Sequence, residues 1–165
     1  MNILYLHGLK GSLSPQKREI LEKFGKVYAP DIDYSADPKA IESILKQYTD
    51  VNIDAVIGSS MGGFAVYYVS TALNSPALLF NPALKWRSVE QSIPEISIGR
   101  SILKQFVIGA KDEVVNPADT LKFISENYNG FTDFYLHLRP ELTHQIPEDV
   151  FEEEVGVFFG KIGVR

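Results

Sequence analysis

Hydrophobic and polar positions follow two alternating patterns along this chain. Short, nearly continuous apolar runs predict buried strands, and longer stretches with apolar residues three and four positions apart predict amphipathic helices. The predicted strands span residues 2–6, 26–29, 54–57, 77–80, 105–108 and 132–138. A run as apolar as 2–6 is typical of a parallel sheet that is covered on both faces.

Helix signals separate the predicted strands. Ser14-Pro15 is an N-cap followed by the residue favoured at the first helical position. Asp37-Pro38 and Asn116-Pro117 open later helices in the same way. The predicted helices span residues 14–24, 37–48, 63–73, 116–128 and 147–159.

Strands that alternate with helices predict a three-layer α/β/α fold with a six-stranded, mainly parallel sheet. A length of 165 residues fits a single domain over 1–165. Residues 81–101 follow no clear pattern, and we expect one helical turn near 86–91. Ligands of such folds bind at the carboxyl ends of the strands, so the residues directly after each strand are the candidates for function.

Composition narrows the function classes. A net charge of -5 and an isoelectric point near 5.2 argue against nucleic-acid binding through broad electrostatics and against a polybasic membrane anchor. The absence of cysteine excludes disulfides, thiolate zinc sites and cysteine nucleophiles, and it fits a reducing cytosol. No apolar stretch is long enough to span a membrane, and residues 1–6 lack the basic region of a signal peptide. We therefore expect a cytoplasmic protein.

Residues Gly58-Ser-Ser-Met-Gly62 match the pattern G-x-S-x-G and join a predicted strand to a predicted helix. Such a sharp turn strains the backbone of the central Ser60 and exposes its Oγ, while the glycines let neighbouring backbone approach. Ser59 is the weaker candidate nucleophile because it fills the variable position. The alternatives are a simple linking turn or a phosphate cradle, but the phosphate-binding glycine motifs are missing.

A serine nucleophile needs a base, and the base needs an acid to hold it. His144 lies in a loop after the last strand and is the candidate base, whereas His137, inside that strand, is expected to be a packed strand residue. Asp112 and Glu113 follow the fifth strand. Asp112 is the first choice as the acid, and Glu113 stays open as an alternative to it.

The tetrahedral intermediate of such a reaction needs two N–H donors. The amide of Met61, directly after the nucleophile, is one candidate. The other is the amide of Leu9, in the loop after the first strand, where the imidazole of His7 would hold the loop.

Four segments together resemble a known family. Residues 5–8, 58–63, 81–83 and 112–114 are similar to those of compact bacterial esterases of the YqiA/YcfP type, within the α/β-hydrolase superfamily. The order Ser60, Asp112, His144 is also the order of that superfamily. The resemblance implies a minimal α/β-hydrolase fold, a short insertion at 81–101 where larger members carry a lid, and hydrolysis of carboxylic esters or acyl thioesters without a cofactor.

Other residues carry weaker signals. Asp31 and Asp33 could form a metal pair, but without a nearby histidine they are expected to be solvated acids, so no metal site is expected. Tyr5, Tyr34 and Trp86 could line an acyl pocket or simply pack.

The sequence therefore predicts a small serine esterase or thioesterase that acts on short or exposed acyl groups of small molecules. Two alternatives use the same residues: a non-catalytic binding or regulatory protein on a hydrolase scaffold, and an acyltransferase with an acceptor other than water.

Overall fold

The sheet is fully parallel. The structure is a computed structural model that describes residues 1–97, 102–128 and 132–163. Its strands are β1 (Asn2–Leu6), β2 (Lys26–Tyr28), β3 (Ala55–Ser59), β4 (Ala77–Phe80), β5 (Leu103–Gly109) and β6 (Asp133–Arg139). They lie in the order β2-β1-β3-β4-β5-β6, with every neighbouring pair parallel. The prediction of a three-layer α/β fold is confirmed.

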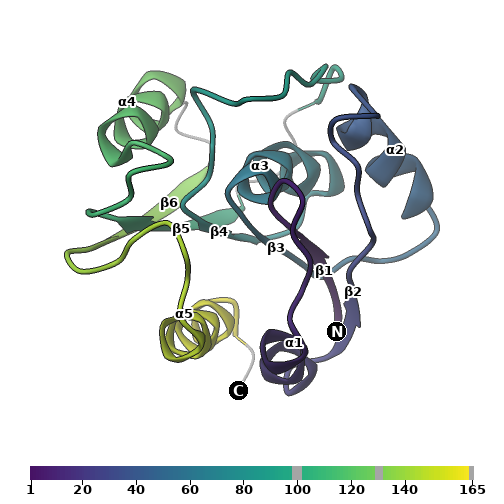
Figure 1. The fold of residues 1–165 in the computed structure, drawn as a ribbon. Helices are drawn as coiled ribbons and strands as arrows, with labels where there is room; N and C mark the ends of the chain where they lie inside the picture. The colour runs from purple at the N-terminus through teal and green to yellow at the C-terminus, as the bar shows by residue number, and fades with distance from the viewer. Residues whose placement is uncertain (98–101, 129–131, 164–165) are drawn as a thin grey trace.

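Helices cover both faces of this sheet. They are α1 (Pro15–Glu22), α2 (Ala40–Gln47), α3 (Met61–Leu73), α4 (Pro117–Asn127) and α5 (Glu148–Lys161). Figure 1 shows α1 and α5 on one face and α2, α3 and α4 on the other. No helix in the described ranges is long and apolar enough to cross a membrane.

The central strands are largely apolar because their successive residues enter two different cores. In β1, Leu4 and Leu6 pack with α2 and α3, whereas Ile3 and Tyr5 pack with α1 and α5. The same division holds in β3, β4 and β5. Neither face of these strands meets solvent, so apolar side chains occupy both faces. This is the physical reason for the continuous apolar runs in the sequence.

Side-chain caps fix where α1 and α4 start. The Ser14 hydroxyl accepts a hydrogen bond from the Lys17 amide at 3.3 Å, and the side-chain Oδ1 of Asn116 accepts one from the Ala118 amide at 2.9 Å. Helix α2 begins at residue 40, later than predicted. The Asp37 carboxylate accepts from the Lys39 amide at 2.8 Å, so residues 37–39 form a turn before the helix.

The predicted helical turn at 86–91 is wrong. The described part of the segment, residues 81–97, contains no helix or strand. Gln91 accounts for this, because its buried amide donates to the Tyr34 carbonyl at 2.8 Å and accepts from the Ala40 amide at 3.2 Å. The buried side chain of Gln91 thus ties this segment to the chain around α2. Residues 98–101 of the expected insertion lie outside the described residues.

Lys104 is a buried charge-bearing group in the sheet. Its side chain, 2% exposed, donates to the Tyr67 carbonyl at 3.0 Å and to the Ser70 hydroxyl, both on α3. Neither partner is charged, so burial lowers the pKa of the Lys104 ammonium to about 7.

This burial predicts a pH-dependent stability. The unfolded chain keeps the Lys104 proton up to about pH 10.4, whereas the folded chain releases it near 7, so stability rises with pH between these values. Relative to Lys104→Met, the free energy of unfolding of the wild type should rise by about 1 kcal/mol per pH unit from pH 7.5 to 9.5 in urea titrations. Lys26→Met, at an exposed position on β2, should parallel the wild type. Parallel pH profiles for Lys104→Met and the wild type would contradict the assignment.

Candidate active site

The G-x-S-x-G segment forms a sharp turn between β3 and α3. Ser60 stands at the turn with φ 54° and ψ −119°, one of four non-glycine residues with positive φ in the described ranges. Positive φ costs a side chain free energy and persists only where the surroundings enforce it. Here the Ser60 amide donates to the Phe80 carbonyl at 3.0 Å, and its carbonyl accepts from the Phe64 and Ala83 amides at 3.0 Å.

The two glycines of the pattern are required by backbone contact. A Cβ at Gly62 would lie 2.0 Å from the Leu6 carbonyl oxygen, and a Cβ at Gly58 would lie 2.5 Å from the same atom. Real Cβ atoms do not approach oxygen so closely. The end of β1 is therefore pressed against the turn, as the motif predicts, and this brings the loop after β1 next to Ser60.

His144 and Asp112 meet although they lie 32 residues apart. His144 Nδ1 and Asp112 Oδ2 are 2.9 Å apart, and the Asp112 side chain is almost fully buried. The other carboxylate oxygen, Oδ1, accepts from the Val114 and Val115 amides, each at 2.8 Å. The carboxylate is thus fixed on both oxygens, and Nε2 is the imidazole nitrogen left for other contacts.

The remaining acid and histidine candidates lie elsewhere. Glu113 is exposed and makes no hydrogen bond to His144. His137 lies on β6, half-exposed, with Nδ1 2.6 Å from the buried carboxylate of Glu154. His7 holds the loop after β1, because its Nε2 accepts from the Ile32 amide at 2.9 Å while Nδ1 contacts the Gly8 carbonyl oxygen at 2.7 Å.

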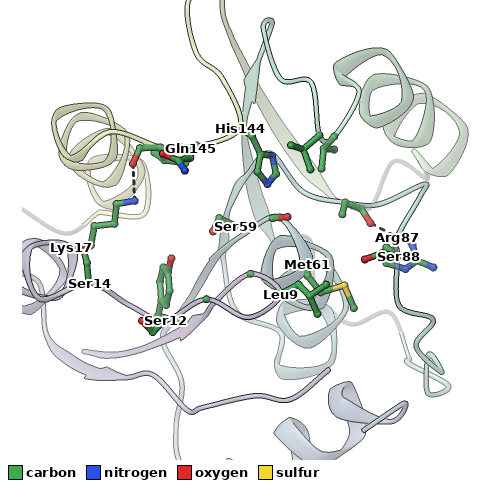
Figure 2. A pocket seen from close by; sticks show the side chains of 18 of the residues that line it. Leu9, Ser12, Ser14, Lys17, Ser59, Met61, Arg87, Ser88, His144 and Gln145 are labelled. Atoms are coloured by element: carbon green, nitrogen blue, oxygen red, sulfur yellow. Dashed lines mark hydrogen bonds between the residues drawn. The ribbon is translucent and has the colours of Figure 1, made fainter. Parts of the chain in front are cut away.

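A cavity of about 650 Å³ brings the predicted site residues together. Ser60, Met61, His144 and Leu9 all line it. In Figure 2, His144 and Ser59 lie above Leu9 and Met61 around the open centre of this cavity. Asp112 lies behind His144 and lines a neighbouring pocket.

Of the aromatic and acidic residues singled out in the sequence, two line the cavity and the others lie outside it. Tyr5 and Trp86 line the cavity, and Trp86 is 73% exposed at its wall. Tyr34 is buried and donates to the His7 carbonyl at 3.2 Å. Asp33 accepts from the Ser35 and Ala36 amides and so stabilises a turn. Asp31 is exposed.

Asn81 is a positioning residue whose role the sequence did not reveal. Its buried amide donates to the Thr143 carbonyl at 2.8 Å and to the His144 carbonyl at 3.2 Å, and its Oδ1 accepts from the Gly109 amide at 2.7 Å. One side chain at the end of β4 therefore fixes the loop that carries His144. A polar residue directly after the apolar strand 77–80 was the available signal.

The fold is a minimal α/β-hydrolase fold. The family model described as uncharacterised protein family UPF0227 matches residues 2–101, and the chain belongs to that family. This agrees with the resemblance to compact esterases of the YqiA type.

Several solved structures share this fold at low sequence identity. Arabidopsis thaliana SOBER1 is 15% identical, with a TM-score of 0.65 over 96% of this chain and 99% of that chain. A Bacillus cereus carboxylesterase is 15% identical, with a TM-score of 0.67 over 96% of this chain and 87% of the other. Staphylococcus aureus FphF, a fluorophosphonate-binding serine hydrolase, is 15% identical, with a TM-score of 0.64 over 98% of this chain and 82% of that chain. At these identities the likeness shows the fold.

The glycine requirement gives a test of the turn. Gly62→Ala should destabilise the protein by about 3 kcal/mol or more, because its Cβ would overlap the Leu6 carbonyl. Gly160→Ala is the matched control, since a Cβ there meets no atom within 4 Å and α5 should gain about 0.5–1 kcal/mol. Urea unfolding of both variants measures these differences. Equal stabilities would contradict the close approach.

Proposed function

We propose that this protein is a serine hydrolase that cleaves carboxylic esters or acyl thioesters of small molecules. The observation that carries the proposal is the combination of Ser60 on a strained turn with an Asp112-held His144 at the same cavity. A strained turn that exposes a serine, a histidine and an acid that orients that histidine are the parts that acyl transfer needs.

Each residue has a distinct task in this mechanism. Ser60 Oγ attacks the carbonyl carbon while His144 Nε2 takes its proton. The Asp112 carboxylate, on Nδ1, selects the required tautomer and stabilises the imidazolium that forms. The amides of Met61 and Leu9 donate to the oxyanion. His144 then protonates the leaving group, and water, activated by the same imidazole, clears the acyl-enzyme.

The cavity wall supports an acyl substrate. Apolar side chains make up part of the cavity wall: Leu9, Met61, Ala83, Trp86, Val114 and Val115. Trp86 and Val114 are both more than 70% exposed, so this side of the site is open. Such an opening favours short or accessible acyl groups over long chains that need a closed tunnel. Two of the solved structures with this fold are described as a carboxylesterase and a serine hydrolase, which is consistent with the proposal.

Turnover of p-nitrophenyl acetate and butyrate tests the nucleophile. Ser60→Ala should lower kcat/KM by at least about 10³-fold, because no other group replaces the attacking oxygen. Ser59→Ala, one residue earlier on β3, is the matched control and should keep most of the activity. Loss of activity in Ser59→Ala alone would make Ser59 the nucleophile. A folded wild type without turnover would favour the non-catalytic alternative, and ester products formed with added alcohols would favour the acyltransferase.

A second pair of variants tests the acid. Asp112→Asn should lower kcat by about 10²–10⁴-fold, because an amide can hold the imidazole in the wrong tautomer. Glu113→Gln, the adjacent exposed carboxylate, should leave kcat within about twofold. Steady-state kinetics with p-nitrophenyl butyrate measure both values. Equal effects of the two substitutions would contradict the assignment of Asp112.

A further inference from the structure

One end of the cavity is polar and cationic. Lys17, Ser12 and Ser14 line this end, next to the loop that carries His144. Figure 2 shows Lys17, Ser12 and Ser14 on one side of the cavity, with Met61 and Arg87 on the other. The proposed function uses none of these polar groups for the chemical step.

The protein holds the Lys17 ammonium in place but does not use all of its N–H donors. It donates to the Ile146 carbonyl at 2.7 Å and lies 5.3 Å from the centre of the Phe151 ring. An ammonium has three N–H donors, so one hydrogen bond leaves two for a ligand. Burial lowers the pKa of Lys17, and the nearby charge of Glu148 on α5 opposes this shift.

Lys17 forms no ion pair with a carboxylate of the described residues. Among the described residues none lies within 4.0 Å of its Nζ, whereas the neighbouring Lys23 is paired with Glu152 at 2.6 Å. Glu148, which acts on Lys17 through its charge, does not line the cavity. Lys17 also borders a neighbouring pocket that Glu148 and Glu152 line, but no ion pair with a described residue holds its ammonium there, so the ammonium can pair with an anion in the cavity.

The rest of the described cavity wall also lacks carboxylates and carries a second basic side chain. No aspartate or glutamate is among the described residues that line it, although the protein carries 21 acidic residues and a net charge of -5. Arg87 lines it too, with its guanidinium 3.9 Å above the Phe64 ring and a hydrogen bond to the Leu84 carbonyl at 2.7 Å. An acidic protein thus presents a positive, carboxylate-free cavity, which attracts anions and repels cations.

We propose that Lys17, with the hydroxyls of Ser12 and Ser14, binds a carboxylate or phosphate carried by the substrate. This inference rests on the function proposed above. Helix α1 begins at this end, directly after Ser14, so its positive terminus adds to the same field. Lys17 is anchored to Ile146, two residues after His144, and its charge therefore lies beside the loop that carries the base. The natural substrate is then an anionic ester or thioester.

The anionic group can belong to the acyl part or to the leaving group, and two matched substrate pairs separate these sources. Mono-4-nitrophenyl adipate and 4-nitrophenyl hexanoate differ by a carboxylate on the acyl chain. 4-Acetoxybenzoate and its methyl ester differ by a carboxylate on the leaving group. Each kcat/KM is divided by the rate of uncatalysed hydrolysis of the same ester, which removes differences in intrinsic reactivity.

The wild type should favour the anionic member of at least one pair by about tenfold, and Lys17→Met should reduce this preference to about twofold or less. Lys17→Arg keeps the charge and should keep most of the preference. Lys26→Met is the matched control, because Lys26 also packs over an aromatic ring, 4.8 Å from the centre of Tyr28, but lies outside the cavity. Thermal unfolding of each variant verifies that it is folded.

The outcomes separate the two proposals. Turnover of both pairs without an anionic preference, or a preference that survives in Lys17→Met, overturns the anion site and leaves the hydrolase intact. Turnover that is absent, or that persists in Ser60→Ala, overturns the proposed function and the anion site with it.

Discussion

The contact between the end of β1 and the turn at Ser60 constrains the nucleophile side of the site. The Leu6 carbonyl oxygen lies where a side chain at Gly58 or Gly62 would have to stand, so only glycine fits on either side of Ser60. Ser60 itself stays at positive φ, at a cost of about 1–3 kcal/mol, where its backbone is bonded to Phe80, Phe64 and Ala83. Because β1 and β3 are adjacent and parallel, the loop that carries Leu9 follows directly at this place.

The histidine side of the site is organised by hydrogen bonds between loops. Asp112 binds two amides of its own loop and the imidazole of His144, while Asn81 binds the carbonyls of residues 143 and 144 from β4. Most of these groups are buried, so an unmade bond would cost about 1–3 kcal/mol. This network positions His144 without a large lid, which agrees with the irregular chain over 81–97.

The sequence predicted what local pattern and strand order determine. The strands were found because two-sided burial leaves continuous apolar runs, and Ser14 and Asn116 were found because helix caps are local. Ser60, Asp112 and His144 could be grouped because the carboxyl ends of parallel strands share one edge. Sequence reasoning missed three features: the role of Asn81, the irregular path around Gln91, and the Lys17 ammonium that has no ion-pair partner among the described residues. Each depends on contacts between segments more than 50 residues apart, and such contacts leave no periodic signal.

The proposed hydrolysis depends on the activation of Ser60 as a nucleophile by His144. The most direct measurement is the labelling of the folded protein by a fluorophosphonate, followed in time by intact mass and mapped by peptide mass spectrometry. One adduct is expected, on Ser60, and it should form at least about 10²-fold more slowly in His144→Gln. An adduct on another residue, no adduct in the folded wild type, or an unchanged rate in His144→Gln would rule out this role of His144.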